Sequence, residues 1–180
     1  MKYSDLRAPI QDGDYQVDVS LEFLTEYFNS LSESYNVQLN PDFQRGHVWT
    51  KRQQQQYIKN FLRNTRTNRL IYFNCIGFSH YEPSELVDLD PKDFLCVDGL
   101  QRLTALLAFR NNELDIDGYF YRDFEDTPRI MVGRIHVNIN TLRAKKELLE
   151  WYLLLNETGV PHSQAELAPI KDMIKELDSK

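Results

Sequence analysis

The chain has 180 residues, the size of one ordinary domain, and a formal net charge of −6 at pH 7. Apolar residues make up 42% of it, which suffices for a core and excludes a disordered tail. No run approaches the roughly 18 apolar residues of a membrane span, and the N-terminus lacks the apolar segment of a signal peptide. We therefore expect one cytoplasmic domain over residues 1–180 that does not coat nucleic acid non-specifically.

The first half of the chain is predicted to contain two helices separated by a short strand. Apolar residues at helical spacing predict a helix that follows Val19, with Ser20 as its cap. A short strand is expected over 35–40. The next helix is expected to begin after Thr50, because Thr50 and Gln53 fit a capping box.

Strands and helices continue to alternate in the second half. The β-branched and aromatic runs at 69–78 and 94–97 are typical of buried strands, with an exposed acidic loop between them. A helix is expected over 100–109, followed by a strand pair or one bent strand over 129–140. This order predicts an α+β domain with a small mixed sheet and flanking helices.

Two further helices are expected at the C-terminal end of the chain. The segment 142–157 has the pattern of a long helix, closed by Gly159. Ser163 and Glu166 fit a capping box for the last helix, which Pro169 should bend or restart.

The cysteines and histidines show no metal-binding spacing. Cys75 and Cys96 lie in apolar strand-like runs without a CxxC pattern, so buried free thiols are expected rather than a disulfide or a zinc site. The histidines are scattered through separate elements, without the spacing of a metal nuclease. They are His47, His80, His136 and His162.

Charge is distributed unevenly along the chain. Residues 41–69 contain seven cations and one anion, which gives 7 − 1 = +6. Residues 82–98 contain six acids and one lysine, which gives 1 − 6 = −5. A solvated helix face and a solvated loop explain most of these charges, so only residues at structural junctions suggest a more specific role.

The stretch "FLCVDGLQRLTALLAF" changes from strand to helix at an Asp-Gly pair. Asp98 is expected to accept from the first amides of the helix, while Gln101 reaches back to the Asp98 amide. A tight turn would require Gly99. Arg102 remains unexplained, because a cation in the first turn is unfavourable by a few tenths to about 1 kcal/mol. A bound anion such as phosphate would reverse that sign.

A second junction, "NPDFQRGHVWT", also places a glutamine and an arginine, Gln44 and Arg45, beside a glycine and ahead of a basic helix. Ligands in α/β folds collect where strands end and helices begin, so the two Gln-Arg pairs could clamp a polyphosphate. Packing is expected for Phe43 and Val48. Trp49 could instead wall the pocket or stack on a base.

These two junctions resemble the N-terminal domain of GmrSD-type modification-dependent restriction systems, a group that includes the SspE defence protein. The family's DGQQR motif is matched by "DGLQR" at 98–102, and its QR-x-x-x-W element by Gln44, Arg45 and Trp49. A late LN-x-x-G element is matched at 155–159. The resemblance spans about residues 20–170 and implies a domain similar to the ParB and sulfiredoxin fold. It also implies nucleotide binding, and for relatives a triphosphatase that needs a divalent ion.

The resemblance implies roles for residues of both junctions. Two arginines would neutralise phosphate oxygens, the amides of 99–101 would cradle one phosphate, and Asp98 would hold Mg²⁺ or orient water. The catalytic set is Asp98, Gln101 and Arg102, with Asp98 also the metal ligand. The nucleotide-binding set is Gln44, Arg45, Trp49, Gly99, Leu100 and Arg102. No GxxxxGK[ST] pattern occurs, so a P-loop enzyme is excluded.

Departures from the family pattern leave three classes of function open. Leu100 replaces the first glutamine of the motif, and no C-terminal HNH-type nuclease domain is expected within these 180 residues. The chain could be a nucleotide-binding protein and weak Mg²⁺-dependent NTPase of a defence, restriction-type or phage-encoded system, acting with a protein partner that supplies an effector or nuclease. It could be a DNA-binding or nicking module that uses the basic segment 41–69. It could also be an inactive interaction protein that uses its acidic loops.

Overall fold

One mixed five-stranded sheet organises the chain, in a computed structural model that describes residues 13–63, 67–79, 87–125, 134–157 and 164–178. The order across the sheet is β1-β5-β3-β4-β2. β1 and β5 are antiparallel, β5 and β3 parallel, β3 and β4 antiparallel, and β4 and β2 parallel. The strands are β1 (Tyr15–Val19), β2 (Asn36–Gln38), β3 (Leu70–Asn74), β4 (Asp93–Asp98) and β5 (Ile135–Asn140).

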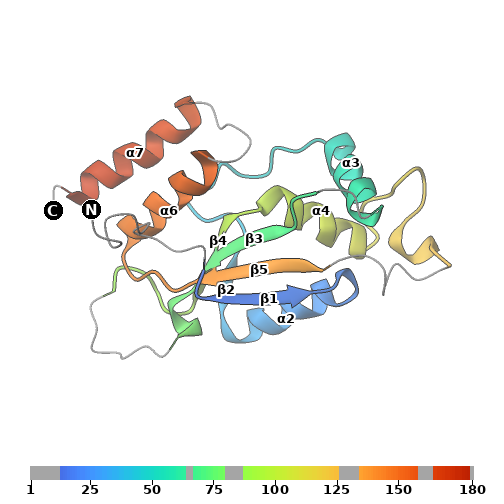
Figure 1. Cartoon of the computed structure of the whole chain (residues 1–180), viewed down its shortest axis with the longest axis horizontal. Coiled ribbons are helices and arrows are strands. Elements are labelled where there is room, and N and C mark those ends of the chain that lie inside the picture. Colours follow the sequence, from blue (N-terminus) through green and yellow to red (C-terminus); the bar gives the residue numbers. More distant parts are fainter. Residues whose placement is uncertain (1–12, 64–66, 80–86, 126–133, 158–163, 179–180) are drawn as a thin grey trace, which may run out of the picture.

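Helices cover both faces of the sheet (Figure 1). α2 and α4 pack against one face of the sheet, and α3 packs on α4. α6 packs on the other face beside β4, and α7 packs on α6. Three short 3-10 segments complete the described part. The helices are α2 (Leu24–Ser34), α3 (Lys51–Leu62), α4 (Leu100–Arg110), α6 (Lys145–Glu157) and α7 (Gln164–Asp178), and the 3-10 segments are η1 (Leu21–Phe23), η2 (Ile76–Phe78) and η3 (Tyr121–Asp123).

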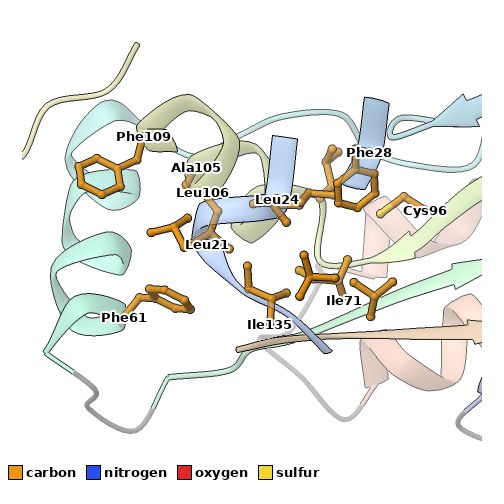
Figure 2. Packing of buried hydrophobic residues seen from close by; sticks show 14 of the residues in the cluster. Leu21, Leu24, Phe28, Phe61, Ile71, Cys96, Ala105, Leu106, Phe109 and Ile135 are labelled. Carbon is orange, nitrogen blue, oxygen red and sulfur yellow. The ribbon is translucent and has the colours of Figure 1, made fainter. Parts of the chain in front are cut away.

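Strand alternation divides the buried residues into two clusters, one on each face of the sheet. In β3, Ile71 and Phe73 point into the cluster beneath α2 and α4, while Tyr72 points toward α6 and α7. Figure 2 shows the first cluster, where side chains from helices and strands converge. Leu24 and Phe61, like Phe73, are fully buried there. The expected α+β domain with a mixed sheet and flanking helices is confirmed.

The N-terminal elements differ from the expectation in two respects. β1 was not predicted, although its sequence YQVDV alternates between apolar and polar residues; the strand has only five residues and is mostly exposed. Ser20 does not cap a helix through its side chain, since the 3-10 turn η1 separates it from α2. The Thr50 capping box of α3 is confirmed, with reciprocal bonds between Thr50 and Gln53.

Side-chain bonds to the backbone shorten two predicted elements. The strand expected over 69–78 ends at Asn74, and η2 follows it. The helix expected from 142 begins at Lys145. Asn74, only 1% exposed, accepts from the Leu142 amide at 2.8 Å and donates to its carbonyl at 3.0 Å, which holds the start of that segment extended.

The C-terminal predictions are only partly testable. α7 is continuous through Pro169, so the predicted restart is not seen; Pro169 is the sixth residue of the helix, where proline removes one intrahelical donor without ending the helix. Gly159, Ser163 and the start of the predicted 129–140 strand lie outside the described residues. No helix in the described ranges is long and apolar enough to cross a membrane. Cys75 and Cys96 are free and buried, as predicted.

Candidate functional site

A left-handed glycine joins β4 to α4. Gly99 has φ of 102° and occupies the N-cap position of α4, where no side chain caps the helix. A Cβ atom at this position would lie 2.9 Å from the Ile71 Cδ1 atom and 3.1 Å from the Ile71 Cα atom. The glycine is therefore required both by its backbone conformation and by the close approach of β3.

Asp98 pairs with Arg102 instead of capping the helix, which corrects the predicted cap. The Arg102 Nη2 atom donates to the Asp98 carboxylate at 2.6 Å and to the Leu70 carbonyl at 3.0 Å. The Arg102 and Asp98 side chains are 16% and 30% exposed. The Asp98 carboxylate thus neutralises the Arg102 guanidinium, and no bound anion is needed to explain why an arginine lies in the first turn of α4. The Arg102 Nε atom is buried without a partner among the described residues.

Gln101 contacts the 46–49 segment rather than the Asp98 amide, which is a second correction. Its Oε1 atom accepts from the Val48 amide at 2.9 Å and the Trp49 amide at 3.0 Å. Its Nε2 atom donates to the Gly46 carbonyl at 2.8 Å. One side chain therefore clasps a loop 52 to 55 residues away in the sequence to the first turn of α4.

Gln44 makes a second clasp between the same two segments. Its Nε2 atom donates to the carbonyls of Cys96 at 3.0 Å and Val97 at 2.9 Å, on the last part of β4. The two Gln-Arg junctions therefore lie together, as the sequence predicted, but their glutamines bond to backbone. The sequence alone does not predict these hydrogen bonds, because their backbone partners lie more than 50 residues away along the chain.

The remaining residues of the 41–50 loop divide between packing and exposure. Phe43 is buried against Tyr152, as expected, whereas Val48 is 49% exposed and the packing predicted for it is wrong. Trp49 is half-buried and its ring lies 5.4 Å from that of Tyr57. Arg45 is exposed.

Leu100 and Tyr57 are both buried in the core cluster next to the β4–α4 joint. Leu100 is 6% exposed and lies in the core cluster, so the side chain at the position of the missing family glutamine points inward. Tyr57, which is buried on α3, donates to the Asn68 carbonyl at 3.0 Å. Burial raises the pKa of Tyr57 to about 12, against the opposing charges of Arg102 and Arg69.

Protein carboxylates offset part of the basic segment 41–69. Lys51 pairs with Asp115 at 2.6 Å and Lys59 pairs with Asp117 at 2.5 Å. Both acids belong to the turn that follows α4. The local excess of +6 in the sequence is therefore reduced by these two pairs.

Two cavities lie away from the joint. One of about 370 Å³ is lined by acidic residues and Lys145, and one of about 610 Å³ lies between β1 and α2. In the described part of the chain, no group of three or more histidine, cysteine or carboxylate side chains is placed to hold a metal ion. Asp98 is thus a single carboxylate, which suits an ion held mainly by phosphates and water better than a protein cage.

Comparison with known proteins gives one family. The model described as "GmrSD restriction endonuclease, N-terminal domain" matches residues 24–134. This match includes both junctions, β3, β4 and the helices α2 to α4. Comparisons with curated proteins and with solved structures find no significant match.

Proposed function

Because the chain belongs to the family of GmrSD restriction endonuclease N-terminal domains, we propose that it binds a nucleoside triphosphate at the β4–α4 joint. Membership in this family indicates a component of a restriction or defence system. We further propose slow Mg²⁺-dependent hydrolysis of the triphosphate and a protein partner that supplies the effector or nuclease. If no nucleotide binds, we would instead conclude that the chain is an inactive interaction protein.

The clasp made by Gln101 is the observation that best supports this proposal. It places the loop of Arg45 against the first turn of α4, which contains Arg102. Amides at the start of a helix favour anions, and two guanidinium groups match the oxygens of a polyphosphate. The proposal does not require Arg102 to be unpaired, since Arg102 already forms an ion pair with Asp98.

A bound triphosphate would have to exchange with Asp98 on Arg102. A phosphate oxygen would take the place of the Asp98 carboxylate at Nη2, and the buried Nε atom could donate to a second oxygen. Asp98 would then be free to hold Mg²⁺, which supplies charge neutralisation between the phosphates. Gln44 and Gln101 hold the 44–49 loop against β4 and the start of α4. Leu100 is buried and has no side-chain amide to offer to a ligand at the β4–α4 joint.

Thermal unfolding with a panel of Mg²⁺-triphosphates tests this function. We expect at least one triphosphate at millimolar concentration to raise the Tm of the parent protein, and Arg102→Ala to abolish the shift. Arg122→Ala is the matched control, because Arg122 is 70% exposed and lies beyond the C-terminal end of α4. An unchanged Tm for every common triphosphate would overturn the proposal in favour of the interaction protein.

DNA binding by the segment 41–69 is the second candidate. Arg52 on α3 and Arg63 directly after it are exposed and form no ion pair within the described residues, so they could contact phosphates. Binding that depends on such contacts should weaken steeply as salt is added. A salt series with labelled duplex measures this dependence, and binding that is insensitive to salt would exclude it.

A further inference from the structure

The outer edge of β1 is a strand edge of five residues that has no lysine or proline to prevent pairing with another chain. β1 ends the sheet, and no strand of the described residues pairs with its outer side (Figure 1). Natural edge strands are commonly shortened or carry lysine or proline, which prevents pairing with other chains. β2, the other edge, has only three residues and lies close to Pro41. The β1 sequence YQVDV contains neither lysine nor proline, and its one acid, Asp18, bonds to His136 of the neighbouring strand β5 at 2.7 Å.

Apolar surface surrounds this edge. Tyr15 is 42% exposed and Phe23, which follows β1, is 61% exposed. A groove of about 610 Å³ between β1 and α2 has a mixed lining, with Val17, Val19, Phe23 and Tyr27 as its apolar and aromatic residues and Asp18, Ser20, Glu26, Ser30 and Arg134 as its polar ones. The Tyr27 hydroxyl is buried without a hydrogen-bond partner among the described residues.

We propose that β1 pairs antiparallel with β1 of a second copy of this chain, so that two sheets join across a two-fold axis. A two-fold axis perpendicular to the sheet keeps the α2 faces of both copies on one side. With Val17 at the axis, Val17 lies opposite Val17 of the second copy, Gln16 opposite Asp18, and Tyr15 opposite Val19.

Charge disfavours the two neighbouring registers. Moving the axis to Asp18 would place two aspartates directly opposite each other, and moving it to Gln16 would place Asp14 opposite Asp18. Like charges in directly opposite positions destabilise a strand pair, whereas aromatic and β-branched partners stabilise it. Centred on Val17, the strand is therefore complementary to itself, with no acid facing another acid.

The groove then receives an aromatic side chain from the second copy. Odd-numbered residues of β1 point to the α2 face, since Val17 and Val19 line the groove and the Tyr15 ring contacts Phe78 of the same core. Opposite Val19, Tyr15 of the second copy would lie over the groove beside Phe23 and Tyr27. This contact would cover apolar surface that the described part of one chain leaves exposed.

Sedimentation velocity over a concentration series tests the dimer. We expect the parent to sediment as a dimer at high concentration. Gln16→Asp should raise the dissociation constant about tenfold, because each dimer would contain two new Asp–Asp contacts. Gln16→Lys, which places a lysine opposite Asp18, should preserve or strengthen the dimer. Gln16 is exposed but donates to the Asp18 carboxylate at 3.2 Å, so the Tm of each variant is also measured where the chain is monomeric, which separates an effect within one chain from an effect on the dimer.

Cross-linking tests the register independently. Two residues facing each other at the axis would have Cα atoms about 4.5 or 5.5 Å apart, within the range of a disulfide. Val17→Cys should therefore form a covalent dimer under mild oxidation, whereas Tyr15→Cys should not, since its two copies would be about 13 Å apart along the strand. The natural cysteines are buried and should not interfere.

Three results would overturn the proposal. They are a parent that is monomeric up to about 0.5 mM, equal effects of the two Gln16 variants, and equal cross-linking of the two cysteine variants. These measurements use no nucleotide, so their failure is independent of any failure of the proposed function.

Discussion

At the residue scale, the joint between β4 and α4 depends on a glycine and an ion pair. Gly99 turns the chain in a left-handed conformation, which moves Asp98 away from the capping position and toward Arg102. Arg102 in turn bonds to the Leu70 carbonyl, so the ion pair also ties the helix start to β3. The same contacts that stabilise the joint would have to rearrange for a ligand to reach Arg102.

Gly99→Ala should destabilise the protein by about 2 kcal/mol or more. The left-handed conformation disfavours a side chain, and the added Cβ atom would meet the backbone of Ile71 at 3.1 Å. Chemical denaturation measures the change in unfolding free energy. Gly118→Ala provides a control with φ of 88° and no atom within 4 Å of the added Cβ, so it should cost less. Equal losses would show that the contact with Ile71 is unimportant.

At the element scale, side-chain bonds decide where the α6 segment begins and how it is attached. Asn74, at the end of β3, bonds to both backbone groups of Leu142 before α6 starts. Asn74 is buried, so these two bonds join the sheet to the layer formed by α6 and α7.

Asn74→Ala should reduce the unfolding free energy by about 2–3 kcal/mol, because it leaves a buried amide and carbonyl without partners. Asn36→Ala is the control, since Asn36 is exposed and its bond to Asp93 at 2.7 Å should contribute less. Chemical denaturation of the two variants gives the comparison. A loss for Asn74→Ala no larger than that of the control would contradict the attachment described here.

Patterns that act over a few residues could be predicted from the sequence, and contacts between distant segments could not. The Thr50 capping box of α3 is local and was confirmed. β1 was missed although its residues alternate between apolar and polar, because so short a run becomes a strand by pairing with β5, which is distant in the sequence. At the site, the meeting of the two junctions was predicted, but the bonding of Gln44 and Gln101 depends on segments about 50 residues apart.

At the scale of the whole molecule, the sheet separates two buried clusters, and both cysteines belong to the one beneath α2 and α4. Cys75 and Cys96 are fully buried. Burial raises the pKa of the Cys75 thiol to about 11 and also raises the pKa of the Cys96 thiol. Both thiols should therefore be protonated and shielded near neutral pH.

Neither thiol should react with a thiol-specific reagent at pH 8 until the chain unfolds, when both should react. The unfolded chain loses thiol protons above the ordinary cysteine pKa of 9, while the native chain retains them, so stability should fall as pH rises above about 9. Thiol titration in buffer and in denaturant measures the first effect. Rapid reaction of the native protein would contradict the packing of this cluster.

The central claim is that a triphosphate replaces Asp98 on Arg102 and that the released carboxylate then holds Mg²⁺. Calorimetric titration of the triphosphate selected by thermal shift into Asp98→Asn, with and without Mg²⁺, tests it most directly. Without Mg²⁺, Asp98→Asn should bind at least as tightly as the parent, because no carboxylate competes for Arg102, and Mg²⁺ should improve its binding less than that of the parent. An Asp98→Asn variant that binds more weakly than the parent without Mg²⁺, or that gains as much from Mg²⁺, would contradict the exchange.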